Sequence, residues 1–523
     1  MDDPQRETLD TSRVEATGDA GATRVWIVVA VLVVALGAAL RLGWHLEGLP
    51  FRVDELRLVA NLGERSYGGL LQPLGHGQNA PAGFLWIEKA VLDTIGEPHE
   101  LALRTPALIA SLAALPLVLV AGRRLGMAHG GLVATFLVAI SPALVLRASD
   151  VKQYASDALV TLVLLVLALP IVEAWRRDPG GGAGRRQLLL LAAAGAAALL
   201  LSHPAAFTVA GTGLVLAALA VRRRQWNRLV ALLPLGVLWL VIFVMLDVVT
   251  ARHAHSRETL LLWFGGDFMP LPPRSAADLV WLAGIPGRLA HALHLPQVGL
   301  AVLLGLLGVR RFVPRHGDRL ALVVAPVILA LLASGFEVYP FEGRLLTFAA
   351  PLVCLLLGAG WQSLVEALHR HRRLIGALLL LVTVRGMVAH LASLPRWAGG
   401  RYDVPAALAA AAPEVHPDDL MLVSGVLRYP FDHYAPRAGI GQPAQVIELP
   451  TAPGAPILNL DGVPLAGRRA WVVMPHRQPA LRAGRGARGD PRPATLALLD
   501  ARGTRLATRS GVNVSAVLYR FAR

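Results

Sequence analysis

An acidic pair near the N-terminus is the first group in this sequence whose side chains could do chemistry. Asp54 and Glu55 are adjacent in Phe51-Arg-Val-Asp-Glu-Leu, about a dozen residues after the first long apolar run. A carboxylate at a membrane surface can take a proton from an acceptor hydroxyl and so act as a general base. Acidic residues also favour the positive N-terminal end of a helix, so the pair alone fits a helix start equally well. We take Asp54 as the candidate base and Glu55 as its catalytic neighbour.

A second polar segment, Ser149-Asp-Val-Lys-Gln-Tyr-Ala-Ser-Asp157, leads into a later apolar run. Lysine occurs at two positions only, Lys89 and Lys152, and arginine is the basic residue everywhere else. The ammonium of Lys152 beside Tyr154 suits a phosphate group because it is a compact point charge. The alternative is that Lys152 merely extends from a helix end toward water. Asp150 of the same segment could orient a substrate.

A third polar turn, Glu337-Val-Tyr-Pro-Phe-Glu-Gly-Arg344, runs directly into the apolar residue Leu345. An arginine at the outer start of a span runs against the bias of basic residues toward the cytoplasm, so Arg344 needs an anionic partner. A lipid phosphate held by both arms of the guanidinium is one suitable partner. Glu342 or Glu337 is the other.

The loop Pro73-Leu-Gly-His-Gly-Gln-Asn-Ala-Pro-Ala-Gly-Phe-Leu-Trp86 follows the acidic pair, and its prolines and glycines indicate an ordered loop that enters a helix. His76, Gln78 and Asn79 could bind sugar hydroxyls, or they could be ordinary polar loop residues. Because His253 and His255 have the wrong spacing for one helix face, no zinc site is predicted. Walker-type phosphate loops and Ser–His–Asp signatures do not occur in the sequence.

The elements that position these residues are predicted to be membrane-spanning helices. Hydrophobic residues make up 55% of the 523-residue chain, in long uncharged runs that indicate a bilayer rather than a soluble core. We therefore predict a mostly α-helical, polytopic membrane protein with about eleven spans near the ~20 residues that a bilayer requires. The predicted spans are centred on residues 25–42, 104–122, 130–147, 153–174, 187–202, 204–221, 228–249, 297–311, 319–336, 344–366 and 373–392.

The net charge of +15 comes from arginine clusters that fall in every second loop. This distribution is the positive-inside bias of membrane proteins, and a nucleic-acid site would instead need a basic face with exposed aromatic residues. It places the polar tail, residues 1–24, in the cytoplasm and the segment after the last span outside. The single cysteine, Cys354, lies in an apolar run and gives no disulfide framework or thiol metal site.

Two regions outside the spans are expected to be folded. The first outward loop, Gly43–Leu103, contains two amphipathic segments, Asp54–Leu71 and Gly83–Ile95, that suit helices lying at the interface. After Leu394 the composition changes to proline, glycine and charged residues. The β-type runs there are Leu420–Val423, Ala470–Met474 and Val512–Tyr519, and the helix-like segments are Pro405–Ala412 and Pro493–Ala501. Residues 25–394 are thus the predicted transmembrane domain, and residues 395–523 a small extracytoplasmic α/β domain.

Taken together, these residues resemble the GT-C superfamily of membrane glycosyltransferases. The resemblance is to the protein O-mannosyltransferase-like branch, glycosyltransferase family 39, which includes lipid A aminoarabinose transferases and rhizobial lipopolysaccharide glycosyltransferases. It covers roughly residues 25–395, and the motifs occur in the same order and on the same predicted side of the membrane. The matching segments are Asp54-Glu55, Asn79-Ala-Pro81, Phe84-Leu-Trp86, Glu100-Leu-Ala-Leu-Arg-Thr-Pro106, Lys152-Gln-Tyr154 and Arg344-Leu-Leu.

The resemblance implies a polyprenyl-phosphate sugar donor, an inverting transfer to a cell-envelope glycan, lipid or protein, and an extracytoplasmic site in the bacterial plasma membrane. Asp54 would be the general base, and the donor phosphate would be held by Lys152, Tyr154 and Arg344. The residues that would orient these groups or the substrates are Glu55, Asp150, His76 and Asn79.

One departure from the family concerns a metal. Lipid A aminoarabinose transferases place a metal-binding glutamate shortly before the proline of the first loop, where this sequence has Gln78 and Asn79. No metal ligand is therefore predicted, and the dependence on a divalent metal is left open.

Two other classes of function were weighed. A transporter or flippase of lipids or solutes would carry charged residues at mid-membrane depth, whereas the predicted spans are nearly free of acidic residues except near their ends. A non-catalytic membrane anchor would not need about eleven spans or three polar outward turns. The glycosyltransferase interpretation accounts for more of the sequence than either.

Overall fold

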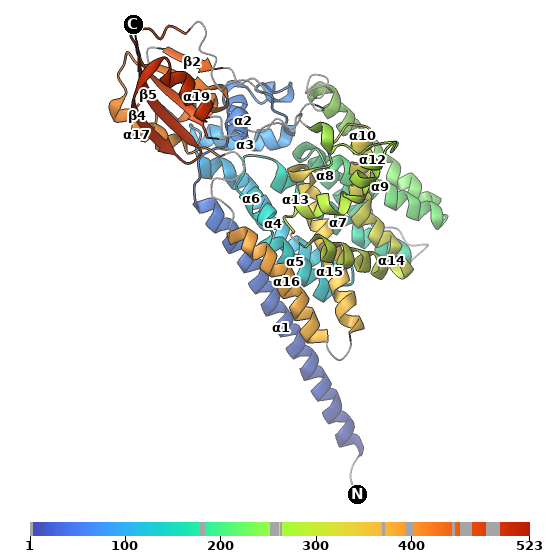
Figure 1. Ribbon diagram of the computed structural model, residues 1–523. Coiled ribbons are helices and arrows are strands. Elements are labelled where there is room, and N and C mark those ends of the chain that lie inside the picture. The colour runs from blue at the N-terminus through green and yellow to red at the C-terminus, as the bar shows by residue number, and fades with distance from the viewer. Residues whose placement is uncertain are drawn as a thin grey trace. The chain divides into compact units, whose positions relative to one another are not determined.

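The computed structural model describes residues 4–177, 184–250, 261, 264–295, 297–368, 372–392, 401–441, 445–449, 463–476 and 492–522. These residues form two compact units (Figure 1). The membrane unit consists of Met1–Leu46, Arg104–Val244 and Met269–Ala392. The α/β unit consists of Glu47–Leu103, Met245–Phe268 and Ser393–Arg523. Each unit is described by itself.

The membrane unit is built from helices, many of which carry acidic residues in the first turn or basic residues in the last, as the helix dipole favours. Their bounds are α1 (Pro4–Leu46), α4 (Glu100–Arg124), α5 (Ala128–Ile140), α6 (Pro142–Arg147), α7 (Tyr154–Arg177), α8 (Arg185–Leu201), α9 (Ala205–Arg222), α10 (Trp226–Thr250), α12 (Ala276–Ala283), α13 (Ile285–Ala292), α14 (Val298–Gly335), η4 (Gly343–Ala349), α15 (Ala350–Ala367) and α16 (Arg372–Ala392).

Among the described residues, seven helices are long and apolar enough to cross a membrane, which supports a multi-pass membrane protein. They are Thr23–Leu46, Glu100–Arg124, Tyr154–Arg177, Ala205–Arg222, Trp226–Val248, His316–Gly335 and Gly343–Ala367. Each of the eleven predicted spans overlaps a described helix almost completely, but α5 and the apolar part of α16 are shorter than a typical span. The count of eleven therefore stays a prediction.

One predicted boundary is wrong for a local reason. The predicted span 130–147 is two helices, α5 and α6, because Pro142 cannot continue α5 and instead begins α6, with Ser141 as its N-cap. The predicted spans 297–311 and 319–336 both lie in α14, on either side of a kink at His316, whose backbone is not helical. The second of them corresponds to the apolar helix His316–Gly335.

Glycines bring the helices of the membrane unit into close contact. A Cβ atom on Gly358 of α15 would collide with the backbone oxygen of Gly130 in α5, and one on Gly360 would collide with that of Leu304 in α14. Small residues at helix interfaces are the usual means of close packing in membranes, where no hydrophobic effect drives helices together. These contacts fix α15, whose N-terminal end continues from η4 and Arg344.

The α/β unit combines the first outward loop with the C-terminal residues. The loop forms α2 (Val53–Glu64), η1 (Gly69–Leu71) and α3 (Ala82–Ile95), close to the two amphipathic segments predicted there. The C-terminal residues form α17 (Val404–Ala411), η6 (Ala412–Glu414), β1 (Leu420–Ser424), η7 (Gly425–Leu427), α18 (Arg428–Tyr434), β2 (Gln445–Leu449), β3 (Arg469–Pro475), α19 (Arg492–Asp500), β4 (Gly503–Gly511) and β5 (Val514–Phe521). A short turn, η3 (Gly265–Asp267), also belongs to this unit.

The strands make one five-stranded sheet in the order β2-β1-β3-β5-β4. β2, β1 and β3 are parallel, and β5 runs antiparallel to both β3 and β4. Apolar side chains such as Leu422, Val472 and Val517 form its core. The predicted runs Leu420–Val423 and Ala470–Met474 are β1 and β3, whereas β4 escaped prediction because its side chains are mostly exposed and polar.

Candidate active site

The turn between α6 and α7 holds a buried ion pair. The Arg147 guanidinium donates to the Asp150 carboxylate, with 2.6 Å between Nη1 and Oδ2, and Asp150 is 1% exposed. A buried carboxylate is stable only when it is paired, so the pair fixes both side chains. Asp150 therefore holds Arg147, which the sequence analysis did not single out.

Tyr154, the first residue of α7, brings two arginines together from distant parts of the chain. Its ring centroid lies 5.2 Å from the Arg147 guanidinium carbon and 5.7 Å from that of Arg344. Arginine over an aromatic face is attracted by the ring quadrupole. The structure thus brings together the predicted residues Tyr154 and Arg344, and it adds Arg147.

Lys152 lies in the same turn and is 6% exposed. A lysine that only extends toward water keeps its ammonium solvated, which this degree of burial does not fit. We refer to Arg147, Lys152 and Arg344, together with Tyr154, as the cation group.

The turn before η4 positions Arg344. Glu342 pairs with Arg288, with 2.9 Å between Oε2 and Nη1. Of the two carboxylates predicted as alternative partners of Arg344, Glu342 thus has Arg288 as a partner. The Tyr339 hydroxyl donates to the backbone oxygen of Leu345 at 2.7 Å. Burial, and then the negative charge of Asp157 and the neighbouring Tyr154, raise the pKa of Tyr339 well above its usual value. Tyr339 therefore stays a neutral donor that ties the turn to η4.

The sequence did contain a signal for Arg147. It ends a predicted span on the outward side, the same anomaly that marked Arg344. Applying that criterion to every span end would have found both arginines. Tyr339 had no comparable signal, since its role depends on burial.

In the α/β unit, the acidic pair at the start of α2 divides into two roles. Glu55 is fully buried and accepts a hydrogen bond from the backbone N–H of Arg52 at 2.7 Å, as the third residue of a capping box does. The Asp54 side chain is 29% exposed and lies 3.6 Å from Arg52 Nε. Glu55 thus caps the helix, and Asp54 is the member of the pair that a substrate could reach.

Glu88 of α3 is a third carboxyl group beside this pair. It is fully buried, and neither of its oxygens has a hydrogen-bond partner among the described residues. Burial, and then the negative charge of Glu55, raise the pKa of Glu88 well above its usual value. The neutral, protonated form of Glu88 is therefore favoured beside Glu55.

The predicted sugar-binding residues differ in their surroundings. His76 has a contact at each ring nitrogen, with Glu64 at 3.1 Å from Nε2 and with the Tyr429 hydroxyl at 2.6 Å from Nδ1. Asn79 is exposed. The contacts of His76 favour a role in holding the loop, and a sugar contact for either residue stays a prediction.

The residues present do not fit a metal site of the kind that the family resemblance suggested. Gln78 directs its Nε2 donor to the backbone oxygens of His76 and Gly77, at 3.4 and 3.2 Å. No group of three or more His, Cys, Asp or Glu residues that could hold a metal ion occurs in the described part of the chain. No reaction step through a metal is therefore derived.

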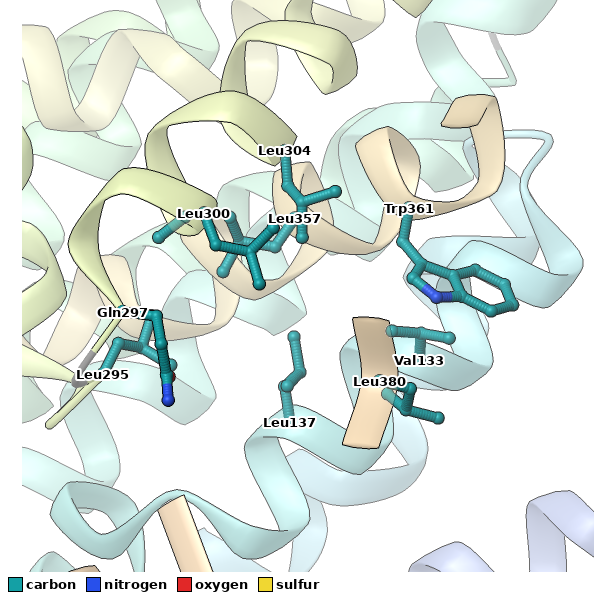
Figure 2. A pocket seen from close by; sticks show the side chains of 10 residues that line it. Val133, Leu137, Leu295, Gln297, Leu300, Leu304, Leu357, Trp361 and Leu380 are labelled. Carbon is teal, nitrogen blue, oxygen red and sulfur yellow. The ribbon is translucent and has the colours of Figure 1, made fainter. Parts of the chain in front are cut away.

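Two cavities lie in the membrane unit outside the cation group. Figure 2 shows an apolar one between α5, α14, α15 and α16, lined mainly by leucines, in which Gln297 and Trp361 donate to backbone oxygens of α16. The other, of about 480 Å³, is lined by Arg311 and Arg319, which pair with Glu366 and Glu173. Since these arginines already have carboxylate partners, the cavity is not a strong anion site.

Comparison with known proteins supports the fold and not the individual residues. No family model matches the sequence, and no curated protein matches it. The structure resembles ArnT from Cupriavidus metallidurans bound to undecaprenyl phosphate, with 16% identity over 95% of this chain and 98% of that chain and a TM-score of 0.53. The same protein in the apo state matches with 16% identity over 96% of this chain and 98% of that chain and a TM-score of 0.50.

This chain therefore has a mostly helical fold similar to that of the two ArnT structures.

Proposed function

We propose that this protein is a glycosyltransferase of the bacterial plasma membrane that moves a sugar from a polyprenyl-phosphate donor to an extracytoplasmic acceptor. The observation that carries the proposal is the cation group, in which two arginines from distant segments both contact the ring of one tyrosine. The fold supports it, because the ArnT structure with the same fold contains undecaprenyl phosphate. The acceptor would be a glycan, lipid or protein of the cell envelope.

The cation group is suited to a lipid phosphate. Arg344 and Arg147 can each offer two parallel N–H donors to phosphate oxygens, and Lys152 adds a point charge. The Asp150 carboxylate fixes Arg147. Donor binding would therefore depend on all three cations and on the Tyr154 ring.

The proposed reaction is a displacement at the anomeric carbon of the sugar. Asp54 takes the proton of the acceptor hydroxyl, whose oxygen forms a bond to the anomeric carbon. The bond between that carbon and the phosphate oxygen breaks, and the leaving polyprenyl phosphate keeps the electron pair. The cation group stabilises the negative charge that develops on the phosphate. Attack on the side opposite to the leaving group inverts the anomeric configuration.

The remaining residues would orient the participants. Glu55 caps α2 and thereby holds Asp54, and Asp150 acts through Arg147. We retain His76 and Asn79 as residues near the sugar or the acceptor. The proposal also retains an N-terminus in the cytoplasm and an extracytoplasmic C-terminal domain, as the arginine clusters predict.

The proposal is tested with the purified full-length protein in lipid nanodiscs. Radiolabelled polyprenyl-phosphate sugars are supplied together with a cell-envelope extract as acceptor, and the released polyprenyl phosphate and the labelled product are measured. We expect release and labelling to rise together. In a parallel liposome assay, movement of the intact donor across the bilayer without any release would support a flippase and contradict the proposal.

A further inference from the structure

The short helix α18 of the C-terminal residues packs against α2, the helix that carries Asp54. Both helices belong to the α/β unit. α18 follows β1 directly through the turn η7, so its position is set by the sheet. The helix therefore connects the sheet to the residues around the candidate base.

Tyr434, at the end of α18, makes two hydrogen bonds to the first loop through one hydroxyl group. It accepts the backbone N–H of Phe51 at 2.8 Å and donates to the Glu100 carboxylate at 2.6 Å. Phe51 lies three residues before Asp54, and Glu100 begins α4. Tyr434 thus ties together the chain on both sides of the first loop.

Tyr429, at the other end of α18, contacts the middle of the loop. Its hydroxyl lies 2.6 Å from His76 Nδ1, and the Arg57 guanidinium of α2 lies over its ring at 5.4 Å. His76 has a positive φ of 60°, a backbone conformation that few side chains adopt without support. Its contacts with Glu64 and Tyr429 supply that support.

Apolar and charged contacts complete the interface. The His433 ring meets the edge of Phe51, with 5.5 Å between centroids. Burial, and then the charge of Arg437, lower the pKa of His433 to about 4, so the ring packs as a neutral group. Arg437 donates to the backbone oxygen of Pro98 at 3.2 Å.

We infer that the C-terminal residues are a positioning part of the transferase site, and that Tyr434 and Tyr429 hold the start of α2 so that Asp54 is correctly placed. This inference rests on the proposed role of Asp54. Both tyrosines act through α2 and are positioning residues. A domain that only bound the acceptor would not need its contacts to converge on residues 51, 57 and 76 of the first loop.

The test compares three variants of the full-length protein that each lose one phenol hydroxyl. Tyr434→Phe and Tyr429→Phe remove contacts to the loop. Tyr519→Phe is the matched control, because the Tyr519 hydroxyl bonds to Asp500 and Arg505 inside the same sheet and not to the loop. Hydrogen–deuterium exchange of α2 and steady-state kinetics are measured for each.

For Tyr434→Phe we expect faster exchange in α2 and a fall in kcat of about tenfold, as the loss of two hydrogen bonds predicts, with the donor KM unchanged. Tyr429→Phe should show the same changes to a smaller extent. Tyr519→Phe should leave both the exchange in α2 and kcat unchanged. Unchanged exchange in α2 of Tyr434→Phe would overturn the inference, as would faster exchange with an unchanged kcat. A wild-type protein that transferred no sugar would instead refute the proposed function, and the exchange measurement would still decide whether α18 holds α2.

Discussion

The cation group of the membrane unit and the carboxylates at the start of α2 are held in different ways. Arg147 and Arg344 both contact the Tyr154 ring, and one carboxylate fixes Arg147. In the α/β unit, Glu55 is buried and caps α2, whereas burial and the charge of Glu55 raise the pKa of Glu88 beside it. We propose that the cations hold an anion and that Asp54, which is partly exposed, is reached by the acceptor.

In the proposed function, the first region binds the donor and the second transfers the proton. Substitutions in the cation group should therefore mainly change donor affinity, and substitutions around Asp54 should mainly change the rate of transfer.

Replacing Asp54 with Asn should reduce kcat by about 10²–10⁴-fold, which is the contribution of a general base. The amide keeps the size of the carboxylate and cannot take the proton. Transfer rates of the purified variant measure the effect. Asp93→Asn is the matched control because it makes the same substitution at an exposed carboxylate of α3. Asp93 pairs with Lys89 and has no role in the proposed reaction. An Asp54→Asn variant as active as the wild type would remove the base from the account.

Replacing Lys152 with Ala should raise the donor KM by about 10–150-fold, the effect of losing one hydrogen bond to a charged group. The kcat at saturating donor should change less. Lys89→Ala is the matched control because Lys89 is the other lysine of the chain and bonds to Leu62 and Asp93 in the α/β unit. Equal donor KM values for the two variants would show that Lys152 does not bind phosphate.

Replacing Glu88 with Gln should change how stability depends on pH. Because the pKa of Glu88 is higher in the folded state than in the unfolded state, the folded protein binds more protons, and the wild type loses stability as pH rises above the usual glutamate range. The loss can reach about 1.4 kcal/mol per pH unit. Thermal unfolding between pH 5 and 8 should therefore show a steeper decline for the wild type than for Glu88→Gln. Parallel curves would contradict the protonated state of Glu88.

Substitutions at Tyr154 should have the smallest effect and separate its ring from its hydroxyl. Tyr154→Leu removes the aromatic ring that Arg147 and Arg344 contact. It should weaken donor binding by about 2–30-fold, because a cation–π interaction contributes about 0.5–2 kcal/mol. Tyr154→Phe keeps the ring and should bind nearly as well as the wild type. If Phe is as damaging as Leu, the hydroxyl and not the ring matters.

Much of the membrane unit could be predicted because the length of the apolar segments and the distribution of arginines among the loops can be read from the sequence alone. The same physics did not reveal that Ser141-Pro142 divides a predicted span into two helices, since hydropathy does not describe backbone hydrogen bonding. Tyr154 and Arg344 were predicted separately, and their shared ring contact depends on how η4 meets α7.

The roles of buried groups were out of reach of the sequence. Glu88 occupies an ordinary helical position, and only its burial beside Glu55 makes its proton significant. Arg41 is the opposite case, in which the sequence signal does not indicate a functional role. It ends a predicted span on the outward side, as Arg147 does. Its guanidinium donates to Ser111 and to backbone oxygens such as those of Val138 and Ala139, and these partners indicate a structural role.

The most direct test of the division between binding and catalysis is the affinity for undecaprenyl phosphate, measured in nanodiscs for the wild type and two variants. Arg344→Ala should weaken binding by about 10–150-fold, since it removes hydrogen bonds between charged groups, whereas Asp54→Asn should bind as the wild type does. Unchanged affinity for Arg344→Ala, or an equal loss for both variants, would contradict the account.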